Sequence, residues 1–242
     1  RDLVRSRGLG DVYKRQEQNQ KDYREYIESW VHEIKAPITA IALNCENNRD
    51  ERSCYLLVEN RKVENYVDMA LYYARMDAVY KDYMIAESNL QEVAQQVLLQ
   101  NKYYLIQSHV KAEVACPDTV YSDKKWIAFI LNQLIQNSVK YGRSEGTHIQ
   151  IVTKKTKRGV LLRVKDDGIG IPKEEIPRIF EKGFTGTNGR NRERSTGMGL
   201  YLCRKLCDKL NIEIRAESAE GKGTEIILMF PVSDYLTGYR ET

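Results

Sequence analysis

The chain opens with two long stretches of helical periodicity. Between residues 23 and 41 apolar side chains recur every three or four positions, which is the spacing of one face of an α-helix. A polar run at 44–50 marks a turn, and a second stretch with the same period covers 51–77. Two amphipathic helices joined by a short turn fold back as an antiparallel hairpin. One hairpin cannot bury both apolar seams, so we expect a homodimer in which two hairpins form a four-helix bundle.

Beyond residue 80 the pattern alternates between segments of helical period and segments of strand period. The helical segments are 90–108, 123–141 and 198–210. The segments predicted as strands are 82–85, 111–116, 148–155, 159–166, 212–217 and 224–230. Helices and mixed strands in this order predict an α+β fold, in which helices cover one face of a sheet.

These patterns divide the chain into four parts. Residues 1–16 have no clean period and no apolar core of a secretory signal, so we expect a non-native or disordered tail. The helical hairpin is expected at 17–79 and the α+β domain at 80–234, with a C-terminal tail at 235–242.

Composition narrows the class of protein. The chain has 242 residues, of which 42% are hydrophobic and 30% charged, as in a globular protein. The longest apolar run, 126–131, is far shorter than the roughly 20 residues of a membrane-spanning helix, so we expect no such segment. Net charge is +4, and the excess is concentrated in the first sixteen residues, which argues against a nucleic-acid partner. Five cysteines without CxxC spacing argue against a disulfide framework or a structural zinc site.

The first candidate for chemistry is the pair His32 and Glu33 in the segment WVHEIKAP. His32 lies about 100° around the helix from Val31, on the flank of the apolar seam, so its ring is expected to be accessible. Pro37 removes a backbone hydrogen bond just beyond it and kinks the helix. A histidine next to a glutamate is also common on ordinary helix surfaces, so this pair alone leaves both interpretations open.

A second candidate is a polar stripe at the end of the helix predicted at 123–141. Asn137, Lys140 and Tyr141 are three and four positions apart and share one face. An amide oxygen, a cation and an aromatic ring suit Mg²⁺, phosphate and a purine base, although an ordinary amphipathic helix end would look the same.

Two glycine-containing segments complete the set. In KDDGIGIP, at 165–172, we expect Asp167 to face a donor such as an exocyclic amine, while Gly168 and Gly170 let the backbone approach a flat ligand. The alternative is a plain turn. In STGMGLYL, at 195–202, Gly197 and Gly199 open a helix whose free N–H groups can bind phosphate. The polar, basic stretch 185–194 before it fits a mobile lid over an anion.

The order and spacing of these segments resemble the sensor histidine kinases of bacterial two-component systems, over residues 20–232. The family's sequence boxes fall in the following places: the H box at 32–37, the N box at 132–141, the G1 box at 167–170, the F box at Phe180 and Phe184, and the G2 box at 197–200. The segments WVHEIKAP and KWIAFILNQLIQNSVKYG most resemble the short intramembrane-sensing kinases that pair with peptide-antibiotic ABC transporters.

This resemblance implies a Bergerat-type (GHKL) α/β sandwich that binds ATP at 80–234, and a dimerisation and phosphotransfer hairpin at 17–79. The γ-phosphate of ATP would pass to His32, with Glu33 as base, and then to an aspartate in the receiver domain of a response regulator. Asn137 would hold Mg²⁺. The other residues that the resemblance assigns to ATP binding are Lys140, Tyr141, Asp167, Gly168, Gly170, Phe180, Gly197, Gly199, Leu200 and Thr224.

The resemblance also implies a location and further partners. We expect the chain to be the cytoplasmic portion of a protein anchored in the cell membrane, with an ABC transporter permease as a partner of the full-length protein. Two positions depart from the family pattern. Ala36 stands where many members carry Thr or Asn, which puts phosphatase activity towards the regulator in doubt, and Gln133 stands where many carry Asn.

Two other functions are open. A Bergerat-type ATPase of another kind, such as a chaperone or mismatch-repair protein, would need no phosphoacceptor, so the His32–Glu33 pair argues against it. A catalytically inactive scaffold would not need Asn137, Asp167 and the glycines of the last box.

Overall fold

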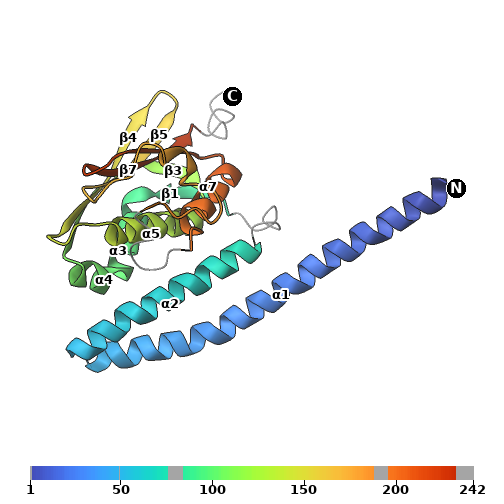
Figure 1. Ribbon diagram of the computed structural model, residues 1–242, viewed down its shortest axis with the longest axis horizontal. Coiled ribbons are helices and arrows are strands. Elements are labelled where there is room, and N and C mark those ends of the chain that lie inside the picture. The colour runs from blue at the N-terminus through green and yellow to red at the C-terminus, as the bar shows by residue number, and fades with distance from the viewer. Residues whose placement is uncertain (1, 49, 76–83, 188–195, 233–242) are drawn as a thin grey trace, which may run out of the picture. The chain divides into compact units, whose positions relative to one another are not determined.

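The computed structural model describes residues 2–48, 50–75, 84–187 and 196–232 (Figure 1). The chain divides into two compact units, Arg1–Val79 and Tyr80–Thr242, and each is described by itself. Within the described ranges, no helix combines the length and the apolar character needed to cross a membrane.

The first unit is an antiparallel pair of helices, α1 (Asp2–Asn48) and α2 (Glu51–Arg75), which lie side by side in Figure 1. Val31 and Ile38 of α1 pack with Val67 of α2 in a buried cluster, which is the seam expected from the sequence period. An ion pair between Lys35 Nζ and Asp68 Oδ1, 2.7 Å long, also joins the two helices.

The N-terminus differs from the sequence prediction. In place of a disordered tail at 1–16, α1 begins at Asp2 and runs without a break into the hairpin. Adding a residue to an existing helix is much easier than nucleating one, and this stretch contains several good helix formers, Leu, Arg, Lys and Gln. The C-terminal tail predicted at 235–242 lies outside the described residues.

The second unit contains a five-stranded sheet in the order β2-β4-β5-β7-β6, in which only the β2–β4 pair is parallel. A separate antiparallel pair joins β1 to β3. The strands are β1 (Ala86–Asn89), β2 (Val110–Ala115), β3 (Thr119–Ser122), β4 (Thr147–Thr156), β5 (Gly159–Asp166), β6 (Glu213–Ala219) and β7 (Gly223–Pro231). The helices are α3 (Leu90–Gln100), α4 (Lys102–Gln107), α5 (Lys124–Lys140), the 3₁₀ turn η2 (Ile176–Arg178) and α7 (Gly199–Lys209).

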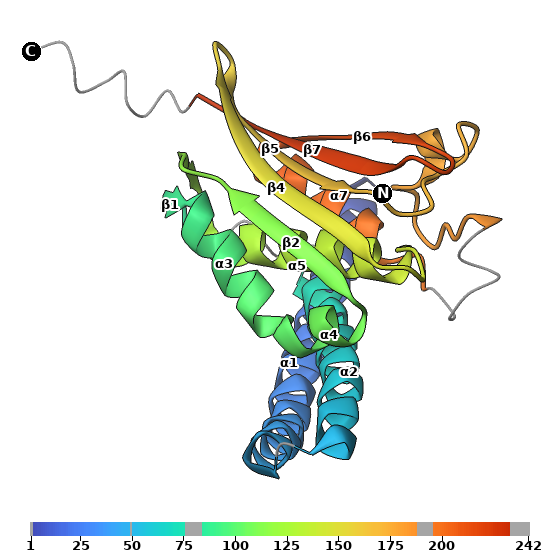
Figure 2. The ribbon, with the colours of Figure 1, turned by 90° about the vertical axis from the view of Figure 1, so that its left-hand side faces the viewer.

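Helices α3, α5 and α7 cover one face of this sheet (Figure 2). Alternate strand residues such as Ile151, Leu162 and Leu228 point into the layer between them and are fully buried, as are Ile127 and Ile135 of α5. Such alternation is the mark of a sheet with one covered face. The prediction of a helical hairpin followed by an α+β sandwich is confirmed.

Local boundaries differ in three places. The first predicted strand, 82–85, is not a strand at its described residues 84 and 85, and β1 begins at Ala86. The helix predicted at 90–108 is broken at Asn101, whose buried side chain donates to Val97 O and Asn132 Oδ1, both at 2.8 Å. Because this amide competes with the helical backbone pattern, α3 ends there and α4 starts anew. Strand β3 was not predicted.

Leu228→Ala should lower the free energy of unfolding of the second unit by about 2–5 kcal/mol, because it leaves a cavity at a fully buried position in the middle of the sheet. The neighbouring substitution Met229→Ala, on the partly exposed side of the same strand, is the control and should cost clearly less. Urea unfolding followed by circular dichroism measures both losses. Equal losses would contradict the assignment of Leu228 to the buried face of the sheet and of Met229 to the more exposed one.

Candidate functional site

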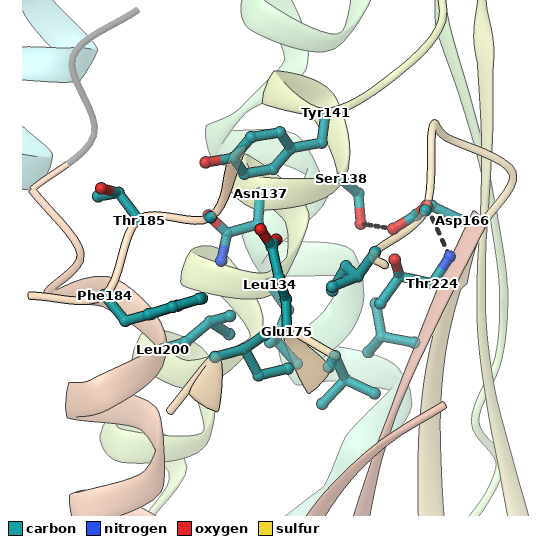
Figure 3. Close-up of a pocket in the computed structure, with 16 residues that line it drawn as sticks. Leu134, Asn137, Ser138, Tyr141, Asp166, Glu175, Phe184, Thr185, Leu200 and Thr224 are labelled. Carbon is teal, nitrogen blue, oxygen red and sulfur yellow. Dashed lines mark hydrogen bonds between the residues drawn. The ribbon is translucent and has the colours of Figure 1, made fainter. Parts of the chain in front are cut away.

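A pocket opens between α5, the ends of β5 and β7, the segment 170–186 and the start of α7 (Figure 3). The space between its walls amounts to about 800 Å³, part of which is open to solvent. The apolar side chains of the lining are Leu134, Val164, Ile171, Ile179, Phe184, Leu200 and Ile226. An apolar cleft with a few fixed polar groups is typical of a ligand site.

Asp166 is the most constrained polar group of the pocket. Its Oδ2 accepts from Ser138 Oγ at 2.8 Å, and its Oδ1 accepts from the backbone N–H groups of Gly168 at 3.0 Å and Thr224 at 3.1 Å. Burial raises the pKa of the Asp166 carboxyl, while the three hydrogen bonds oppose the shift. Asp166 ends β5 and Thr224 lies opposite it on β7, so the register of the sheet positions this acceptor.

The structure does not place Asp167, the acceptor expected from the sequence, at this pocket. Asp167 is exposed and does not line the pocket. Its Oδ1 accepts from His148 N at 2.7 Å, which ties the side chain to the start of β4. Successive residues at the end of a strand point to opposite sides, so only one of two adjacent aspartates can face the pocket. Counting in steps of two from buried Leu162 and Val164 would have selected Asp166.

The last turns of α5 form a second wall. Leu134, Asn137, Ser138 and Tyr141 line the pocket, because positions three and four apart share a helix face. Asp123 starts this helix, since its Oδ1 accepts from Lys125 N at 2.9 Å. The stripe predicted from the sequence is therefore present for Asn137 and Tyr141. Lys140, which the same prediction included, is not among the lining residues.

The first glycine segment is shaped by contacts within the protein. A Cβ at Gly168 would lie 2.6 Å from Tyr141 O, and one at Gly170 would overlap the carbonyl of Ala219. Gly170 also has φ of +70°, which side-chain-bearing residues rarely adopt. The two glycines therefore let this turn pack against α5 and the β6–β7 turn. Only Gly170 of the pair lines the pocket.

Phe184, Thr185 and Leu200 lie across the pocket from Asp166 and Thr224 (Figure 3), and Gly186 also lines it. Phe180, predicted at the site, does not line the pocket, and the Arg204 guanidinium lies 5.8 Å from the centre of its ring.

The predicted Gly197 and Gly199 do not line the pocket either, although Gly199 begins α7, whose next residue Leu200 does. Most of the lid expected at 185–194 lies outside the described residues. The sequence interpretation also missed Glu175, which lines the pocket from the turn before η2.

His32 and Glu33 lie on α1 of the first unit, and both are exposed, as the sequence predicted for a histidine on the flank of the seam. Ala36 is exposed one helical turn further on. The described residues contain no group of three or more His, Cys, Asp or Glu side chains arranged to hold a metal ion.

Residues 122–234 match the family of histidine kinase-, DNA gyrase B- and HSP90-like ATPases. The sensor histidine kinase YxdK of Bacillus subtilis is 33% identical over 207 residues, covering 85% of this chain and 64% of that protein. The sensor protein kinase GraS of Staphylococcus aureus is 35% identical over 218 residues, covering 88% of this chain and 62% of that protein. The chain thus spans slightly less than two thirds of the length of these relatives.

Solved structures share the fold. The catalytic domain of the histidine kinase ThkA superposes with a TM-score of 0.53 at 26% identity, covering 61% of this chain and 97% of that structure. The histidine kinase AdeS of Acinetobacter baumannii has a TM-score of 0.58 at 20% identity, covering 84% of this chain and 98% of that one.

A pair of glycines beside the pocket gives a matched test of this geometry. Gly183 and Gly197 have φ of +73° and +65°, and Gly183 N donates to Gly197 O at 3.1 Å. A Cβ at Gly197 would overlap the Gly183 backbone, whereas one at Gly183 would meet nothing within 4 Å. Gly183→Ala should therefore cost roughly 1–2 kcal/mol of backbone strain, and Gly197→Ala clearly more. Thermal unfolding of the two variants measures the difference, and equal losses would contradict the close contact.

Proposed function

We propose that this chain, a relative of the bacterial sensor histidine kinases with a domain of the histidine kinase-, gyrase B- and HSP90-like ATPase family at 122–234, is the catalytic portion of such a kinase. It would transfer the γ-phosphoryl group of ATP to His32 and then to an aspartate in the receiver domain of a response regulator. The observation that carries this proposal is the half-buried acceptor Asp166 at one end of an apolar pocket in an ATPase-family domain.

The pocket residues fit an adenine nucleotide. Asp166 is an acceptor suited to the exocyclic amine of adenine, and apolar side chains such as Leu134 and Ile171 suit the faces of the ring. Asn137 and Tyr141 lie on another wall, with an amide and a phenol that suit the phosphate end. We assign Asp166 the role that the sequence resemblance gave to Asp167.

Mg²⁺ would neutralise charge on the phosphates, and Asn137 is the side chain that would hold it through its amide oxygen. Mg²⁺ in nucleotide sites commonly takes one or two protein ligands and completes its shell with phosphates and water. A single amide is therefore sufficient on the protein side. Met198 supplies no side-chain cap to α7, so the first N–H groups of this helix suit phosphate oxygens.

The chemical step needs an accessible imidazole, and His32 is exposed. A ring nitrogen of His32 would form a bond to the γ-phosphorus while the bond from that phosphorus to the leaving oxygen of ADP breaks. Glu33 would accept the proton from the ring. The rest of catalysis is positioning and charge neutralisation by the nucleotide pocket.

The hairpin supports a homodimer. Large apolar side chains remain exposed on α1 and α2 of one copy: Tyr26, Trp30, Ile41, Leu43, Tyr55, Leu56, Val63, Tyr66 and Tyr73. A second hairpin would cover part of this surface and complete a four-helix bundle.

The other proposed partners follow from the resemblance of the sequence to sensor histidine kinases. A response regulator would receive the phosphoryl group. Because the chain spans less than two thirds of YxdK and GraS, we further propose that it is the cytoplasmic portion of a longer protein anchored in the cell membrane. An ABC transporter permease would be a partner of that longer protein.

His32→Gln should abolish incorporation of labelled phosphate from Mg-ATP and leave ATP affinity unchanged. The label on the wild type should be labile in acid and stable in base, as expected for a phosphoramidate. Autoradiography after acid or base treatment, together with titration of a fluorescent ATP analogue, measures both properties. Persistent labelling of the variant would move the phosphoacceptor elsewhere, and release of phosphate without any labelling would favour an ATPase of another type.

Asp166→Asn should weaken ATP binding strongly, because it places an N–H donor where an acceptor faces the adenine amine. The matched change Asp167→Asn should have little effect, since Asp167 does not line the pocket. Calorimetric titration with Mg-ATP compares the two affinities. The opposite ranking would restore the role to Asp167.

The affinity for ATP should also fall as pH is lowered through the pKa of Asp166. Burial raises this pKa above its ordinary value, so protonation begins at a higher pH than for an exposed aspartate and removes the acceptor. Titrations at successively lower pH should show the loss in the wild type at a higher pH than an exposed aspartate would give. The Asp166→Asn variant is the control, because only the titration of ATP itself remains in it; an identical pH profile would exclude Asp166 as the titrating acceptor.

A further inference from the structure

The wall at 184–187 is held to the rest of the pocket by Glu175. The Oε1 atom of Glu175 accepts two hydrogen bonds from Thr187, one from its backbone N–H at 2.8 Å and one from its hydroxyl at 2.7 Å. Glu175, Phe184 and Gly186 all line the pocket. One carboxylate therefore fixes the end of a segment whose preceding residues form a pocket wall.

The second oxygen of the same carboxylate lies against Gly186. A Cβ at Gly186 would overlap Oε2 of Glu175, and the three heavy atoms nearest to it all belong to this carboxyl group. The φ of Gly186 is not in the left-handed region, so alanine is compatible with its backbone. The Glu175 carboxylate therefore occupies the space that a side chain at Gly186 would need.

Glu175 is itself held rigidly. Its N–H donates to Pro172 O at 2.9 Å, and its carbonyl accepts from Arg178 N at 2.9 Å. Arg178, at the end of η2, places its guanidinium 4.7 Å from the centre of the Phe184 ring. The same short turn therefore contacts the wall at both ends, through a carboxylate at Thr187 and through a cation–π contact at Phe184.

A carboxylate in a pocket for a triphosphate needs an explanation, because bare negative charges would repel each other. The two hydrogen bonds from Thr187 supply one: the charge is used to hold protein, with the acceptor strength of an ionised group. We infer that Glu175 is a positioning residue, which fixes the wall at 184–187 in the conformation that receives the nucleotide. This inference rests on the proposed function of the pocket as an ATP site.

The experiment compares four variants with the wild type in the full chain: Glu175→Ala, Glu175→Gln, Gly186→Ala and the double variant Glu175→Ala/Gly186→Ala. Glu174→Ala is the matched control, since Glu174 is the exposed neighbour and does not line this pocket. Circular dichroism melting confirms that each variant is folded. Calorimetric titration with Mg-ATP gives Kd, and labelling kinetics give KM and kcat separately.

Glu175→Ala should raise Kd and KM for ATP roughly tenfold, with kcat little changed, because the wall binds nucleotide and does not touch the transferred group. Glu175→Gln should keep most of the affinity, since its amide oxygen can still accept both hydrogen bonds from Thr187. Gly186→Ala should reproduce Glu175→Ala by displacing the carboxylate. The double variant should be no weaker than Glu175→Ala alone, because both changes remove the same contact.

A second measurement needs no nucleotide. Hydrogen exchange at the Thr187 amide should be faster in Glu175→Ala and in Gly186→Ala than in the wild type, and unchanged in Glu174→Ala. This readout tests the attachment of the wall even if the pocket binds another ligand. If the wild type failed to bind ATP, the proposed function would be refuted. The hydrogen-exchange rates would still decide by themselves whether Glu175 holds the wall.

Three results would overturn the inference. Tighter ATP binding in both Glu175→Ala and Glu175→Gln would mean that the carboxylate acts on the phosphates as a repulsive charge. Additive losses in the double variant would mean that Gly186→Ala acts by another route. Unchanged exchange at Thr187 would mean that Glu175 does not hold the wall.

Discussion

The hydrogen bonds of the Asp166 carboxylate join three elements that are far apart in the sequence. Ser138 belongs to α5, Asp166 ends β5, and Thr224 lies at the start of β7. An ionised group taken out of water must be paired or hydrogen-bonded, so these three elements are held in one arrangement wherever the carboxylate stays charged. The pocket exists because α5 and the end of the sheet meet at this point.

The walls of the pocket depend on close backbone contacts around that point. Gly168 lets the turn after β5 approach the end of α5, and Gly170 lets it approach the β6–β7 turn. On the other side, Glu175 and Arg178 hold the segment that carries Phe184. Residues that look like ligand contacts in the sequence thus act on the protein's own backbone, and they shape the space that a nucleotide would occupy.

The proposed chemistry is divided between two units with different constraints. The proposed nucleotide pocket holds its acceptor, Asp166, by hydrogen bonds within the protein, as a site that must recognise one base requires. The proposed phosphoacceptor His32 is exposed on the flank of a helix that packs in the hairpin seam through Val31 and Ile38. An exposed imidazole suits a group that must meet first a nucleotide and later a partner protein.

Periodicity and motif order in the sequence were enough to predict the helical hairpin, most helices and strands of the sandwich, and the presence of Asn137 and Tyr141 on one face of α5, which lines the pocket. These features depend on local patterns that repeat over many residues. Strand alternation in the sequence would have selected Asp166 over Asp167 as the aspartate that enters the pocket. Tertiary structure alone decided that Phe184 and not Phe180 lines it, and that Glu175 belongs to it. The end of α3 at Asn101 is also a tertiary effect, because the Asn101 side chain donates a hydrogen bond to Asn132 of α5. Each of these outcomes depends on strand register or on a contact between distant segments, and no local pattern encodes such a contact.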